Sequence, residues 1–160
     1  MSKTTRALSA TIGVVCVLLA MGATALAATG KKGKADSGTS YVAVTHSSGN
    51  INYSAGNNTD KVLGASAVTY KLKAVPTGVG ATLKLTANPV VLYTRTGSLT
   101  GTGSATLVIT GPTTATVKDG KLVLKKGAGA QKGHSVVATF TGSGNPATGQ
   151  YTFHYKGTYK

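Results

Sequence analysis

The sequence predicts an all-β protein: a single antiparallel barrel, or a sandwich, of about eight or nine strands after an N-terminal signal peptide. Three observations support this prediction. The 160 residues include 22 glycines and only three acidic residues, none of them glutamate, and this composition opposes helices. From residue 41 to residue 160, apolar and polar residues alternate with a period of two. Glycine, asparagine and aspartate residues separate the alternating segments, as turns require.

The N-terminal segment has the features of an export signal. Lys3 and Arg6 precede an apolar run over residues 7–20, and Ala25-Leu26-Ala27 offers the small residues that a signal peptidase reads. The alternative is an uncleaved membrane anchor, but the run is shorter than the ~20 residues that a spanning helix needs. We therefore expect residues 1–27 to be a signal peptide, cleaved between Ala27 and Ala28, from a bacterial protein. The mature chain would be secreted or held in the cell envelope, without a transmembrane span.

Residues 28–40 consist mainly of glycine, lysine, serine and threonine, without apolar periodicity, and predict a disordered basic linker. The barrel domain is expected to span residues 41–160. The single cysteine, Cys16, lies in the predicted signal peptide. A mature domain without disulfides has to be held by its core and its backbone hydrogen bonds.

The alternating segments give the predicted strands in order. Where apolar residues share one parity and threonine or lysine the other, a strand with one buried face is expected. The predicted strands are residues 41–46, 51–54, 66–75, 81–94, 98–110, 114–118, 121–125, 135–141 and 150–159.

Two sites within these strands predict irregular backbone. Asn88-Pro89 interrupts the fourth strand, and because proline cannot donate to a β-ladder we expect a bulge, a kink or an edge there. Tyr93 is expected to point inward, on the same face of the strand as Leu85. Gly101 and Gly103 share the parity of the core residues, as expected where a strand bends to close a barrel.

Asp119-Gly120 predicts a tight turn. As a two-residue hairpin loop it would pair Val117 with Leu122 and separate two short strands.

The residue inventory excludes several enzyme mechanisms. Without glutamate or a mature cysteine, paired-carboxylate, metal-triad and thiol mechanisms lack their parts. The three histidines lack metal-ligand spacing. The sequence therefore predicts no catalytic residue, no metal site, no cofactor and no enzymatic activity.

The apolar faces carry most of the aromatic residues. If the barrel is open inside, these residues line a cavity for a small apolar ligand; if they fill the interior, the role is structural. The predicted cavity-lining residues are Tyr70, Tyr93, Phe140, Tyr151, Phe153 and Tyr155, with His46 and His134 at the rim.

Lysines dominate the polar faces and turns, and the net charge is +14. They can serve solubility and protect sheet edges, or they can bind anionic polymers of the envelope or the extracellular space. With Arg95 as the single mature arginine, sequence-specific nucleic-acid recognition is not expected. The predicted polyanion-binding residues are Lys71, Lys73, Lys84, Lys118, Lys121, Lys125, Lys126 and Lys156.

The C-terminal forty residues carry a resemblance to a known family. A Gly-x-Gly-x-x-x-Gly turn over residues 127–133 precedes a valine- and threonine-rich strand, and the last strand is aromatic and ends in Tyr155-Lys156-Gly157. This pattern resembles the end of allene oxide cyclase and dirigent-type barrels. The resemblance implies eight strands around an interior that can hold an apolar small molecule. Those proteins use acidic residues in the cavity, whereas this sequence has no glutamate and no predicted strand-borne aspartate, so no catalytic residue is carried over.

The expected function is therefore a secreted, non-enzymatic β-barrel that acts as a binding or structural module with a basic surface suited to anionic polymers. The alternative is a dirigent- or cyclase-like barrel that binds or isomerises a small apolar ligand. A third hypothesis is an adhesive or matrix component.

Overall fold

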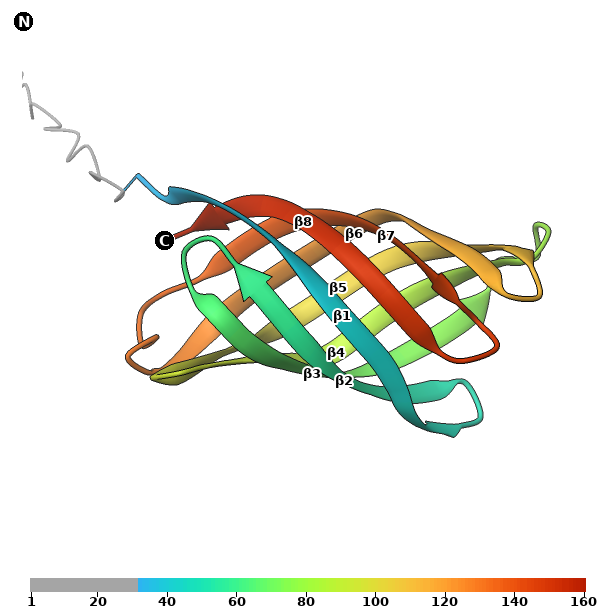
Figure 1. Ribbon diagram of the computed structural model, residues 1–160, viewed down its shortest axis with the longest axis horizontal. Helices are drawn as coiled ribbons and strands as arrows, with labels where there is room; N and C mark the ends of the chain where they lie inside the picture. The colour runs from blue at the N-terminus through green and yellow to red at the C-terminus, as the bar shows by residue number, and fades with distance from the viewer. Residues whose placement is uncertain (1–31) are drawn as a thin grey trace, which may run out of the picture. The chain divides into compact units, whose positions relative to one another are not determined.

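The computed structural model describes residues 32–160, which form a closed barrel of eight antiparallel strands (Figure 1). The barrel prediction is confirmed, and the sandwich is excluded. The predicted signal peptide and the first residues of the predicted linker lie outside the described residues. Within residues 32–160, no helix has the length and apolar character needed to cross a membrane. The strands are β1 (Lys34–Ser48), β2 (Ile51–Asp60), β3 (Gly64–Pro76), β4 (Thr82–Thr94), β5 (Gly97–Gly111), β6 (Thr114–Gly129), β7 (Val136–Asn145) and β8 (Gln150–Tyr159).

Each strand pairs with the next strand in sequence, and β1 pairs with β8 to close the barrel. This connectivity puts alternate turns at opposite ends (Figure 1). We call the end with the β1–β2, β3–β4, β5–β6 and β7–β8 turns the mouth end. The opposite end carries Lys160 and the start of β1, and we call it the terminal end.

β1 begins earlier than the sequence predicted. Lys34 pairs with Tyr159 of β8, and Gly38 pairs with both Tyr155 of β8 and Asp60 of β2. The prediction of a linker that extends to residue 40 is therefore wrong for residues 34–40. This segment has polar side chains on both faces, so its ladder hydrogen bonds form without the apolar alternation that signals a strand.

β6 is one continuous strand, so the predicted hairpin at Asp119-Gly120 is wrong. Asp119 adopts a left-handed conformation with φ 53°. The register between β6 and β7 shifts between Val117 and Gly120, and Gly120 pairs with Phe140. An aspartate-glycine pair that suits a tight turn also suits a β-bulge, because both need a residue with positive φ.

The predicted irregularity at Asn88-Pro89 is confirmed as a bulge, where the register between β4 and β5 shifts between Ala87 and Val90. The extra residue changes which side chains face inward. Val90 and Leu92 are buried, whereas Tyr93 is 48% exposed. The prediction that Tyr93 faces inward is wrong because a one-residue shift moves all later side chains of a strand to the opposite face.

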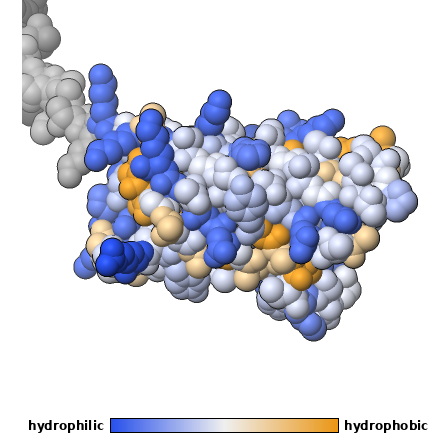
Figure 2. All heavy atoms as spheres, viewed as in Figure 1, coloured by the Kyte–Doolittle hydropathy of each residue, from blue (hydrophilic) through white to orange (hydrophobic). Residues whose placement is uncertain are grey.

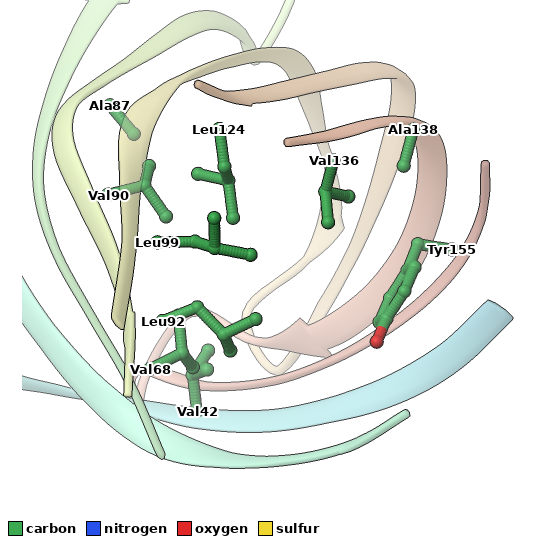
Figure 3. Close-up of a cluster of buried hydrophobic side chains, with 10 residues drawn as sticks. All are labelled: Val42, Val68, Ala87, Val90, Leu92, Leu99, Leu124, Val136, Ala138 and Tyr155. Carbon is green, nitrogen blue, oxygen red and sulfur yellow. The ribbon is translucent and has the colours of Figure 1, made fainter. Parts of the chain in front are cut away.

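Two groups of buried apolar side chains fill much of the barrel interior. Figure 3 shows the larger group pointing inward from the surrounding strands, with Leu99 and Leu124 almost completely buried. The smaller group includes Leu85, Leu107 and Val117. Between and beside these groups, the interior remains partly open.

Candidate functional site

An apolar cavity of about 110 Å³ lies inside the barrel, and we call it the inner cavity. Val68, Val90 and Ala105 are among the residues of its wall. Gly103 also lines it, and a methyl group at this position would have Val90 Cγ2 at 3.7 Å and Ala87 Cβ at 3.8 Å, both ordinary contacts. The missing side chain at Gly103 therefore leaves space that another side chain, or a ligand, can fill.

A second cavity of about 420 Å³, the mouth cavity, adjoins the inner cavity at the mouth end. Residues 146–149 of the β7–β8 loop line it, together with Ser47, Asn52 and Ser54 from the β1–β2 hairpin. Both cavities share Tyr70, Leu72, Leu85, Val117 and Phe153 as lining residues. The two cavities therefore lie side by side along the barrel interior, and their lining becomes more polar toward the mouth end.

Five of the predicted cavity residues line these two cavities. Tyr70 and Phe153 border both cavities, Phe140 and Tyr155 border the inner cavity, and Tyr151 borders the mouth cavity. Phe140 and Phe153 meet edge to face, with ring centroids 5.6 Å apart. Burial raises the pKa of Tyr70 to about 12, so its hydroxyl is neutral at physiological pH.

The two predicted rim histidines and Tyr93 line neither cavity. A bulge between Val44 and His46 turns the imidazole of His46 to the outside, 5.9 Å from the ring of Tyr53. His134 lies in the β6–β7 loop, where its ring stacks on that of Tyr159 at 4.9 Å. The predicted positions are wrong for all three residues. Two separate bulges, on β1 and on β4, turn His46 and Tyr93 outward, and His134 lies in a loop.

A network of polar side chains closes the inner cavity toward the terminal end. Tyr155 and Ser40 both border the cavity. The Tyr155 hydroxyl donates to Asp60 Oδ2 and accepts from Asn58 Nδ2 at 3.1 Å, while Ser40 Oγ donates to Asn58 Oδ1 at 2.6 Å. Asp60 Oδ1 accepts from the backbone N–H groups of Val62 and Leu63, at 2.7 and 2.6 Å. Because these groups already have partners, the closed end of the cavity offers little to a polar ligand.

Asp36 differs from the rest of this network. It is 4% exposed, yet neither carboxylate oxygen has a hydrogen-bond partner. Burial, followed by the neighbouring carboxyl of Asp60, raises the pKa of Asp36 from 3.8 to about 6, against a smaller lowering effect of the nearby backbone N–H groups of Ser37 and Val62. Burial of the ionised carboxylate of Asp36 therefore lowers the stability of the folded protein near neutral pH.

These two buried carboxyls correct the sequence analysis, which expected no strand-borne aspartate inside the barrel. Asp36 lies on β1 and Asp60 ends β2, both pointing inward. Their inward neighbours two and four residues away include Gly38, Ser40 and Asn58, so the inner face here is polar and gives no apolar alternation. Neither Asp36 nor Asp60 borders either cavity.

All eight lysines predicted to bind polyanions are exposed. Strand register brings three of them into one band across the outside: Lys73 pairs with Thr86, Thr86 with Ser104, Ser104 with Lys121, Lys121 with Thr139, and Thr139 with Lys156. We call Lys73, Lys121 and Lys156 the lysine row. Figure 2 shows hydrophilic residues spread over the visible face among residues of intermediate hydropathy.

Comparison of the chain with protein-family models, with curated proteins and with solved structures finds no match. The resemblance to allene oxide cyclase and dirigent-type barrels stays a prediction.

Proposed function

We propose that the barrel binds a small apolar ligand without chemically transforming it. The inner cavity carries this proposal, because it is an apolar space lined by residues of the strands, and its bordering polar groups Ser40 and Tyr155 already have hydrogen-bond partners. Such a site favours apolar over polar ligands. Binding rather than isomerisation is favoured because Asp36 and Asp60 do not border the cavity.

The two volumes limit the shape of the ligand. A cavity of ~150 Å³ holds one benzene molecule in a well-studied case, so the inner cavity of about 110 Å³ accepts only a slender apolar end. The mouth cavity of about 420 Å³ has room for a larger part. Ser47 Oγ donates to Asn52 Oδ1 at 2.6 Å, and the Asn52 amide nitrogen can donate to a polar group at the end of the ligand that remains near solvent.

Uptake of an apolar fluorescent probe tests this proposal. We expect the probe to bind the wild-type protein with little dependence on salt, and Gly103→Leu to abolish uptake by filling the inner cavity. The measurement is fluorescence titration, with circular dichroism to establish that the variant is folded.

Gly111→Leu is the matched control. Gly111 lies on the same strand as Gly103 but borders neither cavity, and the substitution adds the same volume. A methyl group at Gly111 would have its nearest neighbouring atom at 3.9 Å, so the position has room for a side chain. Equal uptake by the wild-type protein and a folded Gly103→Leu variant would contradict the proposal.

A second candidate function, binding of an anionic polymer outside the cell, is supported by the lysine row. Neighbouring strands lie ~4.8 Å apart. Along the lysine row, Lys121 and Lys156 are therefore about 10 Å apart, and Lys73 is about 14 Å from Lys121. Threonine and serine separate them, and no acidic residue lies between them in the row. This spacing suits a polymer with widely spaced charges.

Salt dependence separates this candidate from cavity binding. If the outer surface binds an anionic polymer with one charge per sugar unit, such as polygalacturonate, affinity should fall steeply with salt, because bound counterions are released. In Lys121→Gln/Lys156→Gln, the slope of log affinity against log salt should decrease by roughly one for each lysine removed. An unchanged slope would exclude the lysine row as the binding surface.

A further inference from the structure

Three tyrosines stand exposed on the outside of the barrel, within the four adjacent strands β1 to β4. Tyr41 on β1, Tyr53 on β2 and Tyr93 on β4 are 60%, 42% and 48% exposed. Neither cavity uses them, and none contributes to the buried core. Exposed aromatic residues gathered on one surface are a feature of binding sites, because a ring gives a large contact area at small entropic cost.

Strand register fixes how these tyrosines are arranged. Tyr41 pairs with Asn57, Asn57 with Ala67, and Ala67 with Tyr93, so the two tyrosines end a row that is about 14 Å long. All four residues of this row are exposed. The row therefore presents two aromatic rings with an amide and a methyl group between them.

Small side chains occupy the next outward row. Ala43 pairs with Ala55, and Ala55 pairs with Thr69; all three are half-buried. Beyond them, Tyr53 pairs with Lys71, whose Nζ lies 5.9 Å from the centroid of the tyrosine ring. We call Tyr41, Tyr53, Asn57, Lys71 and Tyr93, with the small residues between them, the tyrosine face.

The tyrosine face carries positive charge and no carboxylate. The whole sequence contains only three acidic residues. Asp36 and Asp60 point into the barrel, and Asp119 lies on β6. Lys71 therefore acts on this face without a neutralising partner, and the face is complementary to an anion.

We propose that the tyrosine face binds a linear acidic polysaccharide. Sugar rings have apolar faces that can cover Tyr41 and Tyr93, hydroxyl groups that can bond to Asn57 and Thr69, and a uronate carboxylate that can pair with Lys71. A span of about 14 Å accommodates a few sugar units. This inference deepens the second candidate function, on which it rests, by naming the polymer class and the face that recognises it.

Charge density favours a polysaccharide over a nucleic acid. Duplex DNA has one negative charge per ~1.7 Å of helix axis, and its binding sites need several cations. The tyrosine face contributes one lysine. Tyrosines can also stack on the bases of single-stranded nucleic acid, and this alternative is an outcome of the test below.

The test measures binding of the full-length chain to polygalacturonate, to its methyl-esterified form and to a single-stranded dT oligomer by calorimetry. We expect polygalacturonate to bind most tightly and Tyr41→Ala/Tyr93→Ala to weaken it at least tenfold. Tyr41→Phe/Tyr93→Phe, which keeps both rings, should bind polygalacturonate with an affinity within about twofold of the wild type. Lys71→Gln should reduce the preference for the acidic over the esterified polymer.

Each result has one meaning. If the wild-type protein binds none of the three polymers, both the anionic-polymer function and the tyrosine face are wrong. If it binds polygalacturonate, and the alanine pair leaves this unchanged while Lys121→Gln/Lys156→Gln weakens it, the polymer function survives and the tyrosine face is wrong. Tighter binding of the dT oligomer would overturn the polysaccharide in favour of nucleic acid. Circular dichroism and the melting temperature establish that each variant is folded.

Discussion

Asp36→Asn should stabilise the folded protein by about 2 to 3 kcal/mol at pH 7. The wild-type carboxyl is buried beside Asp60 without a hydrogen-bond partner, and its pKa is raised from 3.8 to about 6. At pH 7 it is ionised in both the folded and the unfolded chain, and the folded state bears the cost of the buried charge. Asparagine keeps the shape and removes that charge.

The sign of the pH dependence follows from the direction of this shift. Because the pKa of Asp36 is higher in the folded state, the folded protein binds the proton more tightly than the unfolded chain does. The contribution of Asp36 to the stability of the folded protein is therefore most favourable below about pH 4. It is lost as the pH rises from about 4 to about 6, and it stays lost at higher pH. In Asp36→Asn this part of the pH dependence should disappear.

Thermal and denaturant unfolding of both proteins between pH 4 and pH 7 measures the effect, with an expected rise in Tm of roughly 5 to 10 °C for the variant at pH 7. Asp119→Asn is the matched control: Asp119 is exposed, and asparagine also tolerates its positive φ. We expect this control to change stability by less than about 0.5 kcal/mol. Loss of stability in Asp36→Asn at pH 7 would mean that favourable contacts of the carboxylate in the folded state outweigh the cost of burying its charge.

Where the strands are regular, the sequence was sufficient to predict the fold. The alternation on β3, from Val68 through Tyr70 to Leu72, and on β8, from Tyr151 to Tyr155, correctly identified the residues that point inward. In these strands the direction of each side chain can be inferred from that of the residue two positions away, because the side-chain period of a strand is two. Most of the aromatic lining of the cavities could be predicted for this reason.

The errors occur where the backbone departs from that period. Bulges near His46 and Pro89 shift the register by one residue, which turns His46 and Tyr93 outward. The proline indicated a bulge, but composition alone does not say how many residues the bulge inserts or which face the strand presents after it. The tyrosine face was missed for the same reason, since Tyr93 was expected inside.

The polar interior near the terminal end could not be predicted from apolar periodicity. Asp36 and Asn58 point inward at positions where a buried strand normally has apolar side chains. Asn58 finds its partners on other strands, Ser40 on β1 and Tyr155 on β8. Such pairing depends on barrel closure, which brings together residues far apart in the chain.

Gly101→Ala should destabilise the barrel by at least about 3 kcal/mol. A methyl group on Gly101 would lie 1.9 Å from the backbone oxygen of Val123 and 2.7 Å from Leu124 Cα. These atoms belong to the neighbouring strand β6, so they cannot move away as a flexible side chain could. Relief requires separation of β5 and β6, at a place where their register shifts between Thr100 and Gly101.

Gly103→Ala is the control, because it adds the same atoms two residues away on the same strand. Its nearest contact would be the backbone oxygen of Lys121 at 3.4 Å, and its other contacts are ordinary. We expect its stability to stay within about 1 kcal/mol of the wild type, since the methyl group enters the inner cavity. Urea unfolding monitored by circular dichroism measures both variants. Equal midpoints for Gly101→Ala and Gly103→Ala would show that β5 and β6 do not approach as closely at Gly101 as the structure places them.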